Sequence, residues 1–207
     1  MTSYYENFLG CISNSLNCIE ITTIRGERLD PDEGFSQLCR LSGEVRSASY
    51  TQFFCGNGAS AAFANHMALD WTKNGKVKSL SFSDSAMITA LTNDLGDDEV
   101  FAAALCLYAQ QGDLLVTISS SGNSPNILKA IATARECRMG VVTMSGLRPD
   151  NHSRLLGDLN LYVPAKTYGV VECAHQVLLH MWLDRFMGIT EWSWETHQDM
   201  RIKSFKL

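Results

Sequence analysis

The residues best suited to chemistry in this chain begin with a serine-rich loop. Four of the six residues from Ser119 to Ser124 are serines. The apolar, β-branched run 113–118 before the loop is typical of a buried parallel strand, and apolar residues at helical spacing follow from Asn126. Ser124 stands at an N-cap position and Pro125 at the first helical position. Hydroxyls, backbone N–H groups and a helix dipole in one loop favour phosphate binding over an ordinary capped turn.

A second loop repeats this design earlier in the chain. The expected strand Thr51–Cys55 runs into Gly56-Asn-Gly-Ala-Ser60, and a helix follows. Gly56 and Gly58 permit tight backbone turns, and Ser60 is the expected N-cap. In a parallel sheet, loops that follow strands meet at one edge, where ligands bind. The two loops together predict a ligand site at that edge.

His66 and Asp70 lie on the helix that grows from the second loop. They are four residues apart, which is about 40° around a helix axis, so both can address one ion or substrate. The alternative is an exposed pair that stabilises its own helix by a few tenths of a kcal/mol.

A second polar group interrupts the largely apolar helix expected at 170–187. Glu172 and His180 are eight residues apart, about 80° around the helix axis, while His175 falls on the other side of Glu172. With His66 and Asp70, they form a reasonable ligand set for Zn²⁺ or a similar divalent ion. The alternative is that the histidines are hydrogen-bonded core residues, and for His175 we expect that role.

Composition narrows the functional class. The chain has 207 residues, 45% of them hydrophobic, which suits one domain with a sizeable core. Its formal net charge of −5 argues against a non-specific nucleic-acid binder. No apolar run is long enough to span a membrane and no secretory signal is evident, so we expect a cytoplasmic protein. The seven cysteines include no CxxC pair and most fall in segments expected to be buried, as reduced thiols would.

The pattern of elements predicts an α/β fold. Amphipathic helices are expected at 4–19 and 34–47, joined by a connection at 25–31, and they would pack on the sheet and on neighbouring subunits. Strands and helices then alternate, which indicates a doubly wound parallel sheet covered on both faces. The expected strands are Thr51–Cys55, Val77–Phe82, Leu114–Ile118, Val141–Met144 and Leu159–Val163, with helices at 60–73, 85–93, 98–110, 125–138 and 170–187.

Four motifs resemble those of the sugar isomerase (SIS) domain proteins, and most closely the phosphoheptose isomerases. They are Gly56-Asn-Gly-Ala-Ser60, Ala90-Leu-Thr-Asn-Asp94, the run Ser119–Ala130, and Glu172-x-x-His-x-x-x-x-His180. The likeness covers about residues 4–188 in matching order. It implies a single SIS domain over 1–207, with N-terminal helices at 1–48, an α/β core at 49–188 and a tail at 189–207. It also implies a five-stranded parallel sheet and a homotetramer with sites between subunits.

The resemblance assigns roles to individual residues. The serine loop would hold the substrate phosphate, and the sugar would be contacted by the glycine loop, by Asn93 and Asp94, and by Glu172. The implied metal ligands are His66, Asp70, Glu172 and His180, with one Zn²⁺ per subunit, and the implied acid/base pair is Asp70 and His180. The implied substrate-binding residues are Asn57, Gly58, Ala59, Ser60, Asn93, Asp94, Ser119, Ser120, Ser121, Ser124 and Glu172.

This chain departs from the family at two of these positions. Asp70 stands where the family has glutamate, and Glu172 stands where it has glutamine. The implied reaction is the isomerisation of sedoheptulose 7-phosphate to D-glycero-D-manno-heptose 7-phosphate by metal-assisted proton transfer through an enediol. The partners would be a phosphorylated sugar and further copies of the chain, without nucleic acid or membrane.

Two other functions fit the same motifs. Some SIS proteins bind the bacterial replication initiator without catalysis, and others sense phosphosugars. The acidic residue at Asp70 and the histidine at position 180 favour an enzyme, because a binding protein needs neither. Trp192 and Trp194 in the tail alternate with polar residues, as in an edge strand or a clamp on a neighbouring subunit, and His197 is expected to be exposed.

Overall fold

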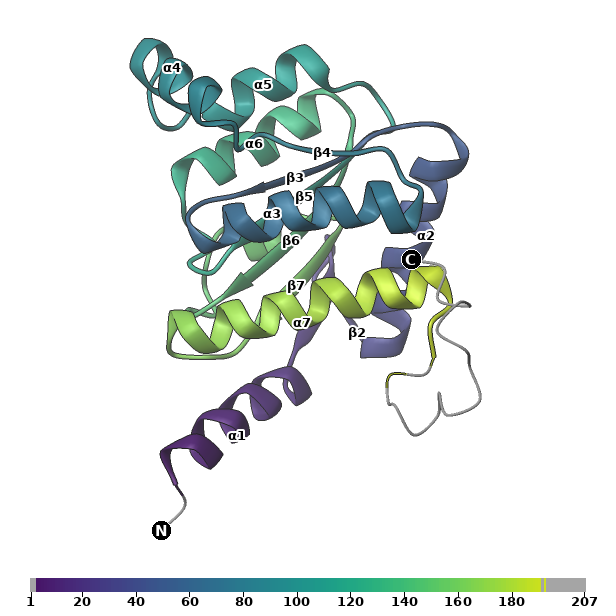
Figure 1. The fold of residues 1–207 in the computed structure, drawn as a ribbon, viewed down its shortest axis with the longest axis vertical. Coiled ribbons are helices and arrows are strands. Elements are labelled where there is room, and N and C mark those ends of the chain that lie inside the picture. The colour runs from purple at the N-terminus through teal and green to yellow at the C-terminus, as the bar shows by residue number, and fades with distance from the viewer. Residues whose placement is uncertain (1–2, 191, 193–207) are drawn as a thin grey trace.

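The structure is a computed structural model that describes residues 3–190 and 192. A central sheet lies between two layers of helices, and α1 extends from one end (Figure 1). The α-helices are α1 Tyr4–Asn17, α2 Pro31–Ser47, α3 Ala59–Asp70, α4 Ser85–Leu95, α5 Val100–Tyr108, α6 Pro125–Glu136 and α7 Tyr168–Met187. The strands are β1 Glu20–Thr23, β2 Arg28–Leu29, β3 Gln52–Gly56, β4 Ser79–Ser81, β5 Leu114–Ser119, β6 Gly140–Gly146 and β7 Leu159–Val163. A π-helical turn, η1, spans Trp71–Gly75, and a 3₁₀ turn, η2, spans Ser153–Leu155.

The sheet has seven strands in the order β2-β1-β7-β6-β5-β3-β4. Strands β3 to β7 are parallel to one another, which confirms the predicted parallel core. The expected count of five strands is wrong, because β1 pairs antiparallel with both β7 and β2. The predicted connection at 25–31 therefore contains β2, and it also contains Pro31, which begins α2.

The unpredicted hairpin has a signal in the sequence. Ile19 and Ile21 alternate with polar neighbours and are buried, and β-branched residues continue to Ile24. Gly26 has a φ of 79°, which suits the tight turn that leads into β2. The predicted first helix ends at Asn17, because the next residues enter this strand.

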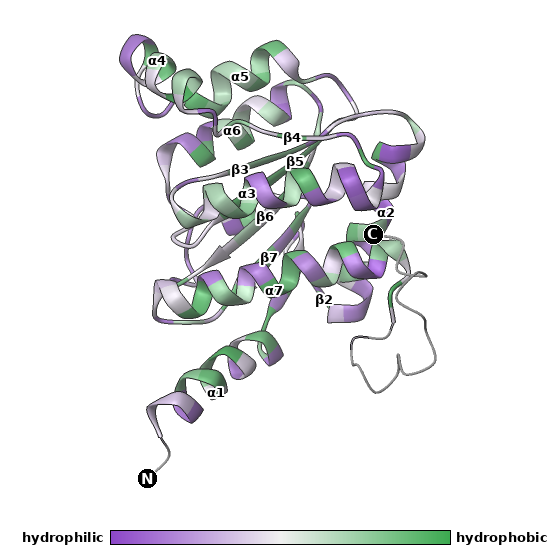
Figure 2. Cartoon of the chain, in the orientation of Figure 1, coloured by the Kyte–Doolittle hydropathy of each residue, from purple (hydrophilic) through white to green (hydrophobic). Residues whose placement is uncertain are grey.

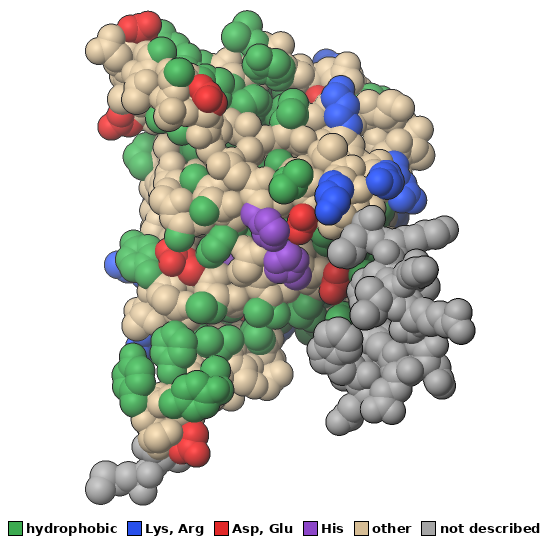
Figure 3. Space-filling view, viewed as in Figure 1, with side chains coloured by type: hydrophobic (Ala, Val, Ile, Leu, Met, Phe, Trp, Pro, Cys, Tyr) green, Lys and Arg blue, Asp and Glu red, His purple; other side chains and the backbone are tan. Residues whose placement is uncertain are grey.

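The two N-terminal helices differ in their packing. Helix α2 begins with a capping bond from the Asp32 backbone N–H to the Asp30 side chain, and it buries Phe35, Leu38 and Val45. Helix α1 instead packs on α7 and leaves apolar side chains in solvent, with Leu9 48% exposed. Apolar residues on α1 are visible at the foot of the molecule (Figures 2 and 3).

Strand alternation divides the core into two clusters, one on each face of the sheet. Phe54 belongs to the cluster with α2, α3 and α7, while its neighbour Phe53 belongs to the cluster with α5 and α6. Successive strand side chains point to opposite faces, so a run of buried apolar residues serves both clusters. The five parallel strands are largely apolar for this reason.

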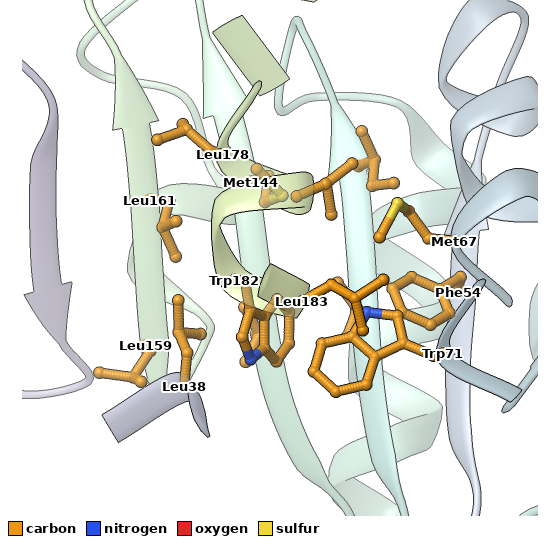
Figure 4. Close-up of a cluster of buried hydrophobic side chains, with 14 of the residues drawn as sticks. Leu38, Phe54, Met67, Trp71, Met144, Leu159, Leu161, Leu178, Trp182 and Leu183 are labelled. Carbon is orange, nitrogen blue, oxygen red and sulfur yellow. The ribbon is translucent and has the colours of Figure 1, made fainter. Parts of the chain in front are cut away.

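Helices α3 and α7 pack on one another across the first of these faces. The Trp71 and Trp182 rings meet edge to face, with centroids 5.1 Å apart, and Phe186 lies 4.9 Å from Trp71. Figure 4 shows these tryptophans with Met67 and Leu178 above the sheet. Aromatic contacts of this kind fix the spacing of the two helices.

The chain connections run in opposite directions from β3 and from β5, which makes a topological switch point between these two strands. This point lies at the edge of the sheet where the site is predicted. From β3 the chain passes through α3 to β4 on one side, and from β5 it passes to β6 and β7 on the other. Gly56 at the end of β3 lies opposite Ile118 near the end of β5. Ligands bind at such points in open α/β sheets, and both predicted loops begin here.

The cysteines do not follow the expected burial. All seven are free thiols, but Cys55 alone among them is buried, and four are exposed on helix surfaces or helix ends. The side of the helix on which a cysteine lies decides its exposure, and the hydrophobicity of the surrounding segment does not. Among the described residues, every helix is too short or too polar to cross a lipid bilayer.

We expect Leu38→Ala to destabilise the protein by about 2–5 kcal/mol, because Leu38 is 0% exposed in the core cluster between the sheet and helices α2, α3 and α7. The matched control is Leu107→Ala, since Leu107 is also helical but 84% exposed, and its effect should stay within about 0.5 kcal/mol. Denaturant unfolding at one fixed protein concentration measures both. Equal losses for the two variants would contradict this packing.

Candidate active site

A cavity of about 270 Å³, here called the serine cavity, lies at the switch point between the serine loop and the glycine loop. It contains every serine-loop and glycine-loop residue predicted to bind substrate, together with Glu172 from α7. Ile118 and Tyr168 also line it, although neither is predicted from the sequence to be a site residue. The sequence holds a weak indication that Tyr168 belongs to the site, because it is the first residue of α7, the helix that carries Glu172. The lining residues are Asn57, Gly58, Ala59, Ser60, Ile118, Ser119, Ser120, Ser121, Ser124, Tyr168 and Glu172.

The serine loop presents its donors to this cavity. Pro125 is the first residue of α6 and Ser124 is the N-cap, as predicted, but the Ser124 hydroxyl makes no capping bond. Neither Ser120 nor Ser124 uses its hydroxyl in a hydrogen bond to another described residue. No lysine or arginine is among the described residues that line the cavity. Hydroxyls, backbone N–H groups and the α6 dipole are thus the available donors for an anion.

The glycine loop starts its helix earlier than expected. Helix α3 begins at Ala59 with Gly58 as its N-cap, so the prediction that Ser60 is the cap is wrong. Gly58 has a φ of 54°, which lets the chain turn sharply enough to start the helix directly. A Cβ on Gly56 would lie 2.6 Å from the Ser60 carbonyl oxygen, so the loop also needs glycine there. The Ala61 and Ala62 amides donate to the Gly58 carbonyl, while the Ala59 and Ser60 amides have no side-chain cap and can donate to a ligand.

The segment after β6 holds the serine loop in shape. The Ser153 backbone N–H donates to the Gly122 carbonyl at 2.9 Å, and the His152 backbone N–H donates to Asn123 Oδ1 at 2.9 Å. Asn151 is buried beneath the loop, and a Cβ on Gly122 would lie 2.0 Å from its Oδ1. Gly122 also has a φ of 63°. Both facts require glycine at this position.

An amide pair joins the two loops. Asn57 and Asn126 exchange two hydrogen bonds, of 2.9 and 3.0 Å, between their side chains. Asn57 leads into α3 and Asn126 is the second residue of α6. The pair therefore fixes the distance between the two helix starts that face the cavity.

His66, Asp70 and His180 form a compact cluster. His66 Nε2 lies 3.3 Å from Asp70 Oδ2, and the His66 and His180 rings lie edge to face with centroids 5.2 Å apart. Two histidines stand side by side on the surface over α3 and α7, with a carboxylate beside them (Figure 3). His66 is more exposed than Asp70, with side-chain exposures of 46% and 18%. The structure brings these three predicted residues together.

The cluster suits a divalent cation. One donor atom from each of the three residues lies within 4.8 Å of the others, and these are imidazole nitrogen and carboxylate oxygen donors. Zn²⁺ binds such donors, and three protein ligands leave a position for substrate or water. Glu172, predicted as a fourth ligand, is not in this group of described residues. It lines the serine cavity and also the groove that contains His180.

Gln176 is a neighbour of the cluster that is not predicted from the sequence. Its Nε2 lies 2.7 Å from His180 Nε2, while its Oε1 is buried and has no hydrogen-bond partner in the described chain. The sequence feature that could have indicated Gln176 is its position one helical turn before His180 on α7.

His175 is a core residue, as predicted. It is fully buried, and its Nε2 donates to the Ser145 carbonyl at 3.1 Å. Burial lowers the pKa of the His175 imidazole to about 4, against the smaller raising effect of that hydrogen bond. His175 therefore stays neutral near pH 7 and supports α7 on the sheet.

Asn93 and Asp94 lie apart from the cavity. They sit near the end of α4, a helix with no buried residue, where Asn93 donates to Asp94 Oδ1 at 2.8 Å. Neither residue lines the serine cavity. Their predicted contact with the sugar stays a prediction.

A largely apolar groove of about 790 Å³ runs along α7 beside the cluster. Phe63, Val177, Met181 and Trp192 line it with Glu172 and His180 among others. Trp192 is exposed, and its indole N–H donates to Asp184 Oδ2 at 3.3 Å. Trp194 and His197 lie outside the described residues, so the expectations for them stay untested.

The chain is similar to known proteins in sequence. A family model described as SIS domain matches residues 44–146. A phosphoheptose isomerase of Aromatoleum aromaticum is 35% identical over 138 residues, which cover 63% of this chain and 70% of that protein. A phosphoheptose isomerase of Mycobacterium tuberculosis is 33% identical over 181 residues, covering 82% of this chain and 92% of that protein.

Solved structures agree in fold. The phosphoheptose isomerase GmhA of Neisseria gonorrhoeae superposes with a TM-score of 0.76 at 27% identity, covering 88% of this chain and 95% of that one. A phosphoheptose isomerase of Francisella tularensis gives a TM-score of 0.76 at 22% identity, covering 92% and 100%.

We expect Gly122→Ala to abolish phosphate binding by the serine loop, because the added methyl group would displace either the loop or the buried Asn151. Gly188→Ala is the matched control: Gly188 also has a positive φ, of 76°, but nothing lies within 4 Å of the point that its Cβ would occupy. It should lose about 1–2 kcal/mol of stability from backbone strain alone. Inorganic phosphate should raise the thermal unfolding temperature of the wild type and of Gly188→Ala, but not of Gly122→Ala.

His175 should make the protein sensitive to acid. Because its folded-state pKa of about 4 lies below the ordinary value of 6.5, its contribution to stability is complete above about pH 6.5. That contribution is lost as the pH falls towards 4, to a total of roughly 3 kcal/mol. We expect His175→Gln to flatten the dependence of unfolding free energy on pH between 6.5 and 4. His152→Gln, at an exposed histidine, should leave the slope unchanged, and a steep slope in both variants would refute the assignment.

Proposed function

The chain belongs to the phosphoheptose isomerase family of SIS domain proteins, and we propose that it converts sedoheptulose 7-phosphate to D-glycero-D-manno-heptose 7-phosphate. The proposal rests on one observation: the serine cavity lies close to the His66, Asp70 and His180 cluster. Glu172 links the two, because it lines both the serine cavity and the groove that contains His180. The cavity holds one end of a phosphosugar, and the cluster acts on the other.

The serine loop binds the phosphate group. Ser119, Ser120, Ser121 and Ser124 supply hydroxyl and amide donors, and the start of α6 adds its dipole. The glycine loop, with Asn57 and the free amides of α3, contacts the sugar hydroxyls beside it. Asn93, Asp94 and Glu172 complete the sugar contacts in this proposal.

The carbonyl end of the sugar reaches the cluster. His66, Asp70 and His180, with Glu172 nearby, provide ligands for one Zn²⁺ per subunit. A bound divalent ion there supplies Lewis-acid polarisation of the carbonyl oxygen. A tight metal ligand is not at the same time a free base, so Asp70 and His180 would take their metal-binding and proton-transfer roles at different times.

Asp70 and His180 carry the proton transfers. Asp70 removes a proton from C1, the electron pair of that bond forms the C1–C2 double bond, and the C2 carbonyl oxygen is protonated. The proton then returns to C2, and the O1 hydroxyl loses its proton as the C1 aldehyde forms. His180 moves the proton between O1 and O2, so atoms and charge balance over the cycle.

Catalysis is favoured over binding alone by the composition of the cluster. A protein that only binds a replication initiator or senses a phosphosugar needs a phosphate cavity but gains nothing from a carboxylate between two histidines. Partial exposure of His66 and Asp70 keeps these groups open to a substrate.

We further propose a cytoplasmic homotetramer. Helix α1 and the groove along α7 leave Tyr4, Tyr5, Leu9 and Met181 in solvent in the single chain. An exposed apolar surface of this kind favours association between copies.

The purified, zinc-supplemented protein should isomerise sedoheptulose 7-phosphate, and Asp70→Asn should lower kcat by about 10²–10⁴-fold, the usual contribution of a positioned base. Asp30→Asn is the control: asparagine caps a helix as well as aspartate, and Asp30 caps α2 away from the cavity and the cluster. Aldose phosphate formed over time is measured for C5 to C7 ketose phosphates. Absence of turnover with every sugar, or full activity in Asp70→Asn, would exclude the mechanism.

A further inference from the structure

Gln176 carries a polar atom without a hydrogen-bond partner, and it lies beside His180 of the His66, Asp70 and His180 cluster. Its amide nitrogen lies 2.7 Å from His180 Nε2, so the amide N–H donates to the imidazole lone pair. The amide oxygen, by contrast, is buried without a hydrogen-bond partner among the described residues. A buried carbonyl without a partner is unfavourable, so this orientation of the amide gains nothing at its oxygen.

The observed hydrogen bond is incompatible with metal binding through the same nitrogen. A nitrogen lone pair that accepts an N–H cannot also bind a cation, and an N–H pointing at a cation is repelled. If His180 binds a cation through Nε2, the Gln176 amide must therefore turn. A half-turn about its last side-chain bond exchanges nitrogen and oxygen, and it brings the oxygen to the position 2.7 Å from His180 Nε2.

This position suits a second ligand of the same ion. Donor atoms that each lie about 2.0–2.2 Å from a tetrahedral Zn²⁺ are about 3.3–3.6 Å apart, so the amide oxygen must also shift outward from its 2.7 Å position by less than about 1 Å. Gln176 and His180 are one turn apart on α7, so both side chains point to the same side of the helix. They also line the same groove. We propose that Gln176 supplies the amide oxygen that completes the His66, Asp70 and His180 site.

Glu172 then has a different task. It lies one turn before Gln176 and two turns before His180, and its donor atoms are outside the three-residue cluster. Its side chain borders the serine cavity with Tyr168 and the glycine loop, and it also lines the groove that contains His180. The inference, which rests on the proposed isomerase function, assigns Glu172 to the sugar and Gln176 to the metal.

The exchange matters for the charge of the site. With Asp70 and a neutral amide, a divalent cation keeps a net positive charge, whereas a second carboxylate ligand would cancel it. A cation with residual positive charge polarises a carbonyl more strongly. A neutral ligand at Gln176 is therefore the better match for the proposed chemistry.

The test measures zinc affinity rather than turnover. The metal-stripped wild type, Gln176→Leu, Gln176→Glu and Glu172→Gln are titrated with Zn²⁺ against a chromophoric chelator, after circular dichroism has shown each to be folded. We expect Gln176→Leu to bind Zn²⁺ at least about tenfold more weakly, Gln176→Glu to bind as tightly as the wild type or tighter, and Glu172→Gln to change affinity less than about threefold. The Co²⁺-saturated forms should show a visible spectrum that changes in Gln176→Leu, as the loss of a directly bound donor requires.

Three results overturn the inference. The first is wild-type affinity and an unchanged Co²⁺ spectrum in Gln176→Leu. The second is a loss of affinity in Glu172→Gln as large as that in Gln176→Leu, and the third is a wild type that binds no Zn²⁺. Wild-type turnover of sedoheptulose 7-phosphate is assayed separately, so weak zinc binding by Gln176→Leu beside an inactive wild type would uphold the ligand and reject the isomerase function.

Discussion

The packing of α3 against α7 is the constraint on which the His66, Asp70 and His180 cluster depends. His66 and Asp70 stand on one helix and His180 on the other, so their separation is set by the helix contact and not by any loop. Trp71 follows Asp70 directly, and its ring meets Trp182, two residues after His180. The largest buried side chains of the described chain are thus close sequence neighbours of the polar cluster. Rigid apolar packing beneath a partly exposed polar group is how a folded chain holds reactive side chains close together.

The two ends of the site are built by different means. The phosphate end is made of backbone and hydroxyl donors at the starts of α3 and α6, held by the Asn57–Asn126 pair and by the segment that contains Asn151. The reacting end is made of imidazole and carboxyl side chains on long helices. Main-chain donors can be positioned by turn geometry alone, whereas acid/base chemistry needs side chains. The switch point between β3 and β5 brings the two kinds of construction to one edge.

Local signals in the sequence are sufficient to predict most of the fold and the convergence of the cluster. Apolar strands, the Ser124-Pro125 helix start and the four-residue spacing of His66 and Asp70 depend on near neighbours. The β1–β2 hairpin escapes prediction because a short β-branched run also fits the end of a helix. The start of α3 differs from the prediction because the φ of Gly58 is set by its loop and not by the capping preference of Ser60. Gln176 cannot be found from spacing alone, since a helical glutamine is ordinary until a buried amide oxygen without a partner in the described chain is seen.

The composition of the phosphate cavity sets how a substrate arrives and leaves. A chain of net charge −5 offers no long-range attraction to an anionic sugar, and the described lining of the cavity adds no cationic side chain. Dipoles and hydroxyls act only over the last few ångströms, so encounter is unsteered and depends on diffusion and orientation. Because these interactions are short-ranged, a small shift of the product breaks its hydrogen bonds to the loop. The hold of the loop on an anion therefore depends on the shape of the loop.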